Sequence, residues 1–401
     1  MYLREVVTKK EKALFLNFPD EIHKDNAAYI RPLDKDIEAV FDPQKNKFFQ
    51  NGKCTRWLLF NKNNQAIGRI AAFINRQYLQ EQPTGGIGFF DCTDDQNAAN
   101  AMFDFCKKWL ENQGMQAMDG PINFGERINW WGLLVEGFQS PLYGMNYHPP
   151  YYRKLFENYG FKIHYQQNCY NYDLTATLPK KFYRLKELAE ANNVFELRHI
   201  SKKHIDKFAK DFAAIYNKAW ASHGEGKSIE EKEAVKLFRE MKAVIDEQTI
   251  WFAYHNNQPI GCWLNLPDLN DYFKQLKPRL NLSALLKFLW LKKYRPTNKL
   301  VGVLFGIVPG FQNKGIDAYL IVKGLEAIAA TKKYSRYEMQ WIGDFNPKMI
   351  NVAQNMGAQN SRKFATFRLM FGNKHTDISG RILNKVQAAE TLAGRHSSII
   401  S

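Results

Sequence analysis

The feature that most constrains this chain is an internal repeat. Residues 55–68 read as strand, Asn-rich turn and strand, and they recur, one residue shorter, at 249–261. Residues 149–160 match 346–357 in the same way, and both read as a short helix closed by a left-handed glycine. Two matches in the same order predict a duplicated fold. We expect domains at 1–178 and 181–372, followed by a C-terminal tail, 373–401, with a short helix around 382–392.

Each copy places strands and helices in alternation after a helical front end. In the first half, the pattern predicts a helix over 98–110 and a strand near 115–118. In the second half, a strand over 300–307, a helix over 317–331 and a strand over 337–342 follow the same order. Alternation of this kind indicates an α/β fold with a mixed sheet in each domain.

The segment 308–318, Val-Pro-Gly-Phe-Gln-Asn-Lys-Gly-Ile-Asp-Ala, lies between a predicted strand and a predicted helix. A glycine-containing turn before a helix directs backbone N–H groups and the positive end of the helix dipole at one point, which suits a pyrophosphate. Gln312-x-x-Gly315 resembles the acyl-CoA pyrophosphate loop of the GNAT acyltransferase superfamily, Gln/Arg-x-x-Gly-x-Gly/Ala. The chain departs from that pattern at Asp317, for which we expect a role as helix N-cap.

Together with the element order, this loop makes nearly the whole chain similar to a tandem two-domain GNAT protein of bacteria. The resemblance implies an N-acyltransferase that uses acetyl-CoA or another acyl-CoA as co-substrate and a small-molecule or peptide amine as acceptor. It implies cofactor contacts at Ile307, Val308, Gln312, Asn313, Lys314, Gly315, Ile316, Asp317 and Ala318.

The first half has an acidic segment where the second half has its glycine loop. Residues 91–98 contain three aspartates and no glycine. Carboxylates at a helix start cap the helix themselves and repel a pyrophosphate. We therefore expect the first domain to lack the cofactor and the second to bind it.

The resemblance also implies groups that move protons. For the base or amine anchor, the strand after the loop and its exit offer Glu338 and Asn346, with Asp344 as a weaker candidate. The superfamily's usual acid, a tyrosine on the late helix, is replaced by Ala353 here and by Phe156 in the first half. Solvent or Tyr319 would then protonate the thiolate, or catalysis is absent.

A long aromatic segment, 120–132 and 145–152, is rich in Asn and Gly. Loops of this kind are often functional, and we expect Trp131, Tyr151, Tyr152 and Trp341 to line an acceptor pocket. The alternative is that Trp130, Trp131 and the two tyrosines hold the domains together.

The segment 271–299 combines many basic residues with the apolar run 280–291. This composition is typical of a weak anionic membrane contact or a fatty-acyl clamp, and equally of an inserted helix packed on the sheet.

Charge and cysteine usage limit the remaining alternatives for partners and cellular location. The formal net charge of +16 favours anionic partners such as CoA phosphates, tRNA or a membrane surface, or serves only solubility. Scattered cysteines and histidines predict neither disulfides nor a metal, and the charged N-terminus is not a signal peptide. We expect a soluble, cytoplasmic monomer. The rival functions are a non-catalytic tandem GNAT-like scaffold and a Fem-type aminoacyl-tRNA-dependent transferase.

Overall fold

A computed structural model describes residues 1–78, 80–191, 194–220, 228–276, 278 and 281–372. The tail predicted at 373–401, with its short helix, lies outside the described residues. The first half forms β1 (Tyr2–Glu5), α1 (Lys9–Ile22), α2 (Asp34–Val40), β2 (Gly52–Phe60), β3 (Ala66–Asn75), β4 (Thr84–Cys92), α3 (Gln96–Glu111), β5 (Ala117–Gly120), β6 (Leu133–Glu136), α4 (Tyr152–Tyr159) and β7 (Lys162–Asp173).

The second half repeats this order with an additional first helix and an inserted pair of helices, and β6 has no counterpart among its described residues. Its elements are α5 (Lys180–Ala191), β8 (Phe195–His199), α6 (Ile205–Trp220), α7 (Glu231–Met241), β9 (Ile250–His255), β10 (Gln258–Pro267), α8 (Asn270–Phe273), α9 (Leu282–Tyr294), β11 (Lys299–Ile307), α10 (Ile316–Ala330), β12 (Arg336–Gly343), α11 (Pro347–Asn355) and β13 (Gln359–Met370). The predicted hairpins are β2–β3 and β9–β10. The predicted left-handed glycines that close α4 and α11 are Gly160 and Gly357.

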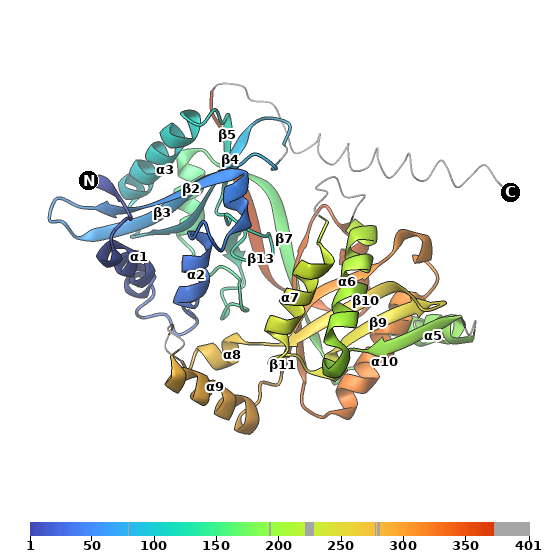
Figure 1. The fold of residues 1–401 in the computed structure, drawn as a ribbon. Helices are drawn as coiled ribbons and strands as arrows, with labels where there is room; N and C mark the ends of the chain where they lie inside the picture. Colours follow the sequence, from blue (N-terminus) through green and yellow to red (C-terminus); the bar gives the residue numbers. More distant parts are fainter. Residues whose placement is uncertain (79, 192–193, 221–227, 277, 279–280, 373–401) are drawn as a thin grey trace.

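All strands join one mixed sheet in the order β1-β2-β3-β4-β5-β13-β7-β12-β11-β10-β9-β8, with β6 paired to β13. The pairs β4–β5 and β11–β12 are parallel, and the other pairs are antiparallel. This arrangement confirms the predicted α/β fold with a mixed sheet. Figure 1 shows the first half on the left and the second half on the right, with β7 and β13 crossing between them.

The two halves exchange their last strands, which the sequence did not predict. Strand β7 of the first half pairs with β12, and β13 of the second half pairs with β5. Ala365 and Phe367 from β13 therefore lie in the hydrophobic core of the first half. Tyr170 and Tyr172 from β7 lie in the core of the second half. The division at 178/181 stays a prediction about separate domains, because each sheet half is completed by a strand of the other.

The strand registers show which residues of the two halves are equivalent. Gly68 of β3 pairs with Cys92 of β4, and Gly261 of β10 pairs with Ile307 of β11. Because Gly68 and Gly261 occupy the same place in the repeat, Cys92 corresponds to Ile307. The following helix starts closer to this equivalent position in the first half, at Gln96, than in the second half, at Ile316. The two halves thus differ here by the longer loop of the second half, residues 308–315.

Candidate functional site

At Ile307, the last residue of β11, the backbone N–H and C=O point away from the neighbouring strand β10. The Val308 N–H donates to the Ile260 carbonyl at 2.8 Å. Because hydrogen-bonding directions alternate along an antiparallel pair, the N–H and C=O of Ile307 point to the other side. On that side, the β11–β12 ladder ends at Gly302 and Met339. Ile307 therefore lies beyond the point where the two parallel strands stop pairing.

The predicted cofactor loop wraps around this strand end. The Gln312 side-chain Nε2 donates to the Ile307 carbonyl at 3.1 Å. Asn313 and Gly315 have left-handed backbones, with φ of 60° and 75°. Lys314 is exposed, and its Nζ lies 5.2 Å from the centre of the Phe311 ring. The loop thus brings a backbone turn, an amide side chain and a cation to one strand end.

Helix α10 starts without a side-chain cap. Its N-cap is Gly315, and no side chain in the described part of the chain accepts from its first N–H groups as a cap. The prediction that Asp317 is the N-cap is therefore wrong: Asp317 lies within the first helical turn. Gly315 is held against α5, where an added Cβ would approach the Leu185 carbonyl oxygen to 2.8 Å. Glycine alone fits this left-handed, crowded position, so α10 begins without a side-chain cap, and the Asp317 carboxylate in its first turn is the acidic group next to the helix dipole.

In the first half, the equivalent polar groups bind other parts of the protein. The Cys92 N–H donates to the Tyr152 hydroxyl at 2.8 Å, and the Tyr151 hydroxyl donates to the Cys92 carbonyl at 2.7 Å. The Asp95 carboxylate caps α3 by accepting from the N–H groups of Asn97 and Ala98. Asp95 thus has the capping role predicted for the aspartates, whereas Asp91 accepts from Arg69 Nε at 2.6 Å. That this half lacks the cofactor stays a prediction.

The Asp95 cap offers a direct stability test. Asp95→Ala should lower the free energy of unfolding by about 1 kcal/mol, because two N–H groups of α3 lose their acceptor. Asp94→Ala is the matched control, since its side chain is exposed and does not cap the helix. Urea unfolding followed by circular dichroism measures both. Equal stability of the two variants would contradict the assigned cap.

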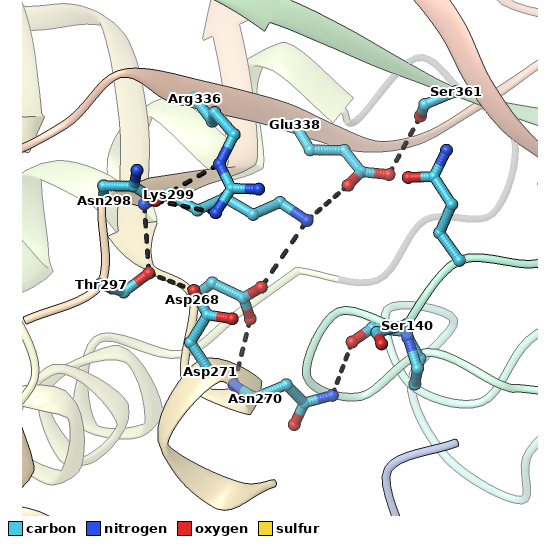
Figure 2. Close-up of polar contacts among 12 residues, drawn as sticks. Ser140, Asp268, Asn270, Asp271, Thr297, Asn298, Lys299, Arg336, Glu338 and Ser361 are labelled. Carbon is cyan, nitrogen blue, oxygen red and sulfur yellow. Dashed lines mark hydrogen bonds and ion pairs between the residues drawn. The ribbon is translucent and has the colours of Figure 1, made fainter. Parts of the chain in front are cut away.

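Glu338, predicted as base or amine anchor, lies inside a buried ionic network (Figure 2). Its carboxylate accepts from Arg362 Nε at 2.6 Å and Nη2 at 3.0 Å, and from the Ser361 hydroxyl at 3.0 Å. Lys299 Nζ lies 2.7 Å from the same carboxylate. Burial acts to raise the pKa of Glu338, but Arg362 and Lys299 outweigh it, so the pKa is lowered. These contacts favour a role in joining strands; the role as base stays a prediction.

Comparisons with known proteins agree with this architecture. No protein-family model matches the chain. A bacterial ceramide synthase of Caulobacter vibrioides is 26% identical over 373 residues, which cover 90% of this chain and 95% of that protein. Protein YghO of Escherichia coli is 24% identical over 375 residues, covering 91% and 94%.

Two solved structures share the fold. A tandem GNAT protein from the clavulanic acid biosynthesis pathway superposes with a TM-score of 0.53 at 9% identity, over 93% of this chain and 100% of that one. This chain has the tandem GNAT fold. The GCN5-related glucosamine N-acetyltransferase region of a fungal multi-domain GH3 β-N-acetylglucosaminidase superposes with a TM-score of 0.54 at 10% identity, over 92% of this chain and 38% of that one.

The ionic network around Glu338 also contains an acid with a shifted pKa. Asp268 Oδ2 lies 3.7 Å from Lys299 Nζ. Burial raises the pKa of Asp268 to about 6, and Lys299 opposes this only in part. Its neighbour Asp271 has the opposite shift: burial acts to raise its pKa, but hydrogen bonds from Thr297 and Lys274 lower it overall. Both residues are drawn in Figure 2.

These shifts predict a pH dependence of stability with a definite sign. The unfolded pKa of an aspartate is about 4, so the stabilising contribution of protonated Asp268 is complete below that pH and is lost as the pH rises through about 6. The cost at pH 7.5 is up to about 3 kcal/mol. Asp268→Asn should therefore be more stable than the parent near pH 7.5 and equally stable near pH 4. Thermal unfolding midpoints measured across this range test the prediction.

Asp271→Asn is the control of opposite sign. Because the folded pKa of Asp271 is lowered, its charge contributes stability above the unfolded pKa. This variant should lose stability near neutral pH. A common response of both variants would contradict the opposite shifts of the two carboxyl groups.

The four residues predicted for an acceptor pocket do not come together. Trp131 packs in a cluster of the first half with Phe73 and Phe124, and its Nε1 donates to the Tyr165 hydroxyl at 2.7 Å. Tyr151 and Tyr152 belong to the main core of the first half. Trp341 packs instead where the two halves meet. A single pocket lined by all four is thus not formed, and their part in acceptor binding stays a prediction.

The other predicted chemical groups have structural partners. Asn346 is the N-cap of α11 and accepts from the Met349 N–H at 3.2 Å. Ala353 and Phe156, which stand in place of the superfamily's tyrosine, are fully buried in the cores of their halves. Tyr319 has Glu190 and Lys186 of α5 as its electrostatic neighbours, and burial raises its pKa. Tyr319 therefore faces α5, and its role as substitute acid stays a prediction.

Sequence reasoning missed a cluster that joins the halves, which we call the junction cluster. It contains Leu134, Leu142, Met145, Tyr147, Cys169, Val301 and Phe364, with Ala28, Tyr29, Phe138, Val303 and Trp341 partly buried against it. The loop of the first half is bound here by Arg362 Nη1, which donates to the Ser140 carbonyl at 3.0 Å, and by Asn270 Nδ2, which donates to the Pro141 carbonyl at 2.8 Å. The first half therefore covers the sheet of the second beside β11.

A histidine at the edge of this cluster was also missed. The His23 ring stacks on Tyr29 with a centroid distance of 4.1 Å and contacts Tyr147 edge-on. Both ring nitrogens are buried without a hydrogen-bond partner among the described residues. Burial lowers the pKa of His23, so the imidazole is neutral near pH 7. No sequence motif distinguishes this histidine, because its environment is assembled from separate loops.

Proposed function

We propose that this protein is an acyl-CoA-dependent N-acyltransferase whose second half binds acyl-CoA. The observation that carries the proposal is the contrast between the two equivalent strand ends. Around Cys92, the polar groups are bound by Tyr151 and Tyr152, and the next helix is capped by Asp95. Around Ile307, the described side chains bind only the carbonyl, through Gln312, and α10 starts at a left-handed glycine without a side-chain cap. The second arrangement leaves the helix N-terminus to an anion.

The residues present fit the co-substrate in two places. The start of α10, with Lys314 and the loop amides, suits a pyrophosphate, and the Ile307 N–H is directed to polarise a carbonyl group beside β11. Acyl-CoA supplies an acyl group already activated as a thioester. The chain then has to hold the acceptor amine in its neutral form and place its nitrogen against the acyl carbon.

For the acceptor, we propose an amine carried on a long apolar chain. A ceramide is the fatty acyl amide of a long-chain amino alcohol, and the ceramide synthase of Caulobacter vibrioides matches this chain over 90% of its length. The apolar side chains of the junction cluster, among them Val303 and Trp341, support an acceptor of this kind. His23 is our candidate for the base, because its neutral imidazole stacks on Tyr29 of the junction cluster and neither ring nitrogen has a hydrogen-bond partner among the described residues.

The test has a binding arm and a product arm. Calorimetry with acetyl-CoA and palmitoyl-CoA should show binding of at least one of them, with free adenosine as the control for non-specific association. Mass spectrometry should then detect an amide when a long-chain amino alcohol is supplied with the bound acyl-CoA, and little product with ethanolamine.

The outcomes separate the rival functions. Absence of binding to every CoA compound, together with binding of aminoacyl-tRNA, would replace the proposal by a Fem-type transfer. Absence of both would indicate a scaffold protein. If acyl-CoA binds but no amine gives a product, the proposed acyl-CoA site is supported and the proposed acceptor is rejected.

A further inference from the structure

Helix α9 exposes an apolar face to solvent. Leucines and aromatic residues along it are between 48% and 73% exposed: Leu282, Leu285, Leu286, Leu289, Trp290 and Tyr294. Their spacing of three and four residues places them in one stripe along the helix. The opposite face, with Phe288 and Leu291, is buried against Tyr272 of α8. The helix is thus apolar on both faces, and only one of them is covered in the described structure.

Basic side chains accompany this stripe. The sequence of α9 contains Lys287, Lys292 and Lys293 and no acidic residue, and Arg295 follows directly. Lys293 Nζ lies 5.1 Å from the Tyr294 ring centre, and the Arg295 guanidinium lies 5.8 Å from the Trp290 ring centre. The cations therefore border the apolar stripe, which is the pattern of a helix that lies in a membrane interface.

A basic hollow adjoins the C-terminal end of α9. Lys292 Nζ donates to the Ala243 carbonyl just after α7. Burial is the main cause of the lowered pKa of Lys292, and the nearby Lys202 lowers it further. The hollow, of about 500 Å³, is lined by the basic side chains of Lys202, Lys203, Lys207, Arg239 and Lys242 together with His204, Ile205 and Asp206. It suits anionic headgroups rather than an apolar ligand.

We propose that α9 lies on the surface of an anionic lipid bilayer, with its leucine and aromatic stripe among the acyl chains and the adjoining lysines at the headgroup phosphates. Figure 1 shows α8 and α9 at the lower edge of the molecule, away from the crossing strands. Among helices of the described ranges, none is long and apolar enough to cross a bilayer. The contact is interfacial, and it does not depend on the proposed acyltransferase activity.

A second copy of the chain is a less suitable occupant of this face. In a two-fold dimer the same patch meets itself, so the lysines bordering one stripe would face those of the other. The stripe spans one helix of 13 residues, about 20 Å long. A strip of that length and about 10 Å wide covers about 200 Å², which is small against the roughly 800 Å² that each partner buries in a stable interface. Charge complementarity thus favours phospholipid.

Flotation of the full chain with lipid vesicles tests the proposal. The protein should float with phosphatidylcholine vesicles that contain about 30% phosphatidylglycerol, and much less with phosphatidylcholine alone. The double variant Leu286→Gln/Trp290→Gln should bind at least about tenfold more weakly. Lys293→Gln/Arg295→Gln should lower binding at low salt and reduce its salt dependence. Leu188→Gln on α5, where the side chain is 57% exposed, is the matched control and should bind like the parent.

Circular dichroism should show that every variant remains folded. The proposal is overturned if the parent does not float with anionic vesicles, or if the α9 variants bind as well as Leu188→Gln. It is also overturned if sedimentation shows a dimer that the Leu286→Gln/Trp290→Gln variant abolishes, because α9 would then bind a second copy.

Discussion

Glu338→Gln should lower the free energy of unfolding by about 3–5 kcal/mol, because it leaves a buried guanidinium without its counter-charge. Both side chains of the Glu338–Arg362 pair have 0% exposure. Glutamine keeps the shape of the side chain and one acceptor oxygen, so the change removes charge rather than volume. Arg362 would retain only the carbonyl groups of Gln139 and Ser140 as acceptors beside the new amide.

Glu136→Gln is the matched control for this variant. Glu136 pairs with Lys363, the residue after Arg362, at 2.9 Å, and these side chains are 55% and 26% exposed. Exposed pairs contribute about 0–1 kcal/mol, so the control should be close to the parent in urea unfolding. If Glu338→Gln is as stable as the control but loses acyl transfer, the role of Glu338 is that of a base after all.

Gly310→Asp should weaken acyl-CoA binding by a factor of roughly 30. A carboxylate about 8 Å from a phosphate charge costs about 2 kcal/mol at an effective dielectric constant of about 20. Gly310 is exposed, has an ordinary φ and has open space at its Cβ position, so the fold should tolerate the change. Gly315 is unsuitable for the same experiment, because a side chain there would meet the Leu185 backbone.

Gly310→Asn separates charge from shape. It has nearly the size of aspartate without the charge, and its Kd for acyl-CoA should lie within about twofold of the parent value. Calorimetry on both variants, with thermal unfolding to confirm folding, gives the comparison. If Asn and Asp weaken acyl-CoA binding equally, or if neither weakens it, the 308–318 loop is not the pyrophosphate site.

The local structure of both halves was readable from periodicity and turn residues. The glycine at 160 and its counterpart at 357 close helices as predicted, because left-handed geometry at a helix end is a local property. The same holds for the Asp95 cap and for the strand that leads into the 308–318 loop. The predicted N-cap at Asp317 was wrong because contact with α5 selects Gly315, and α5 lies far away along the chain.

The sequence by itself thus determined the duplication and the mixed sheet, and it predicts a pyrophosphate site in the glycine loop at 308–318, since each depends on patterns of residues close together in the chain. Only the tertiary structure decided the exchange of β7 and β13, the burial of Glu338 against Arg362 and the separation of Trp131 from Trp341. These features depend on strand neighbours from opposite halves. A pattern with period two shows which face of a strand is buried, but not which strand lies beside it.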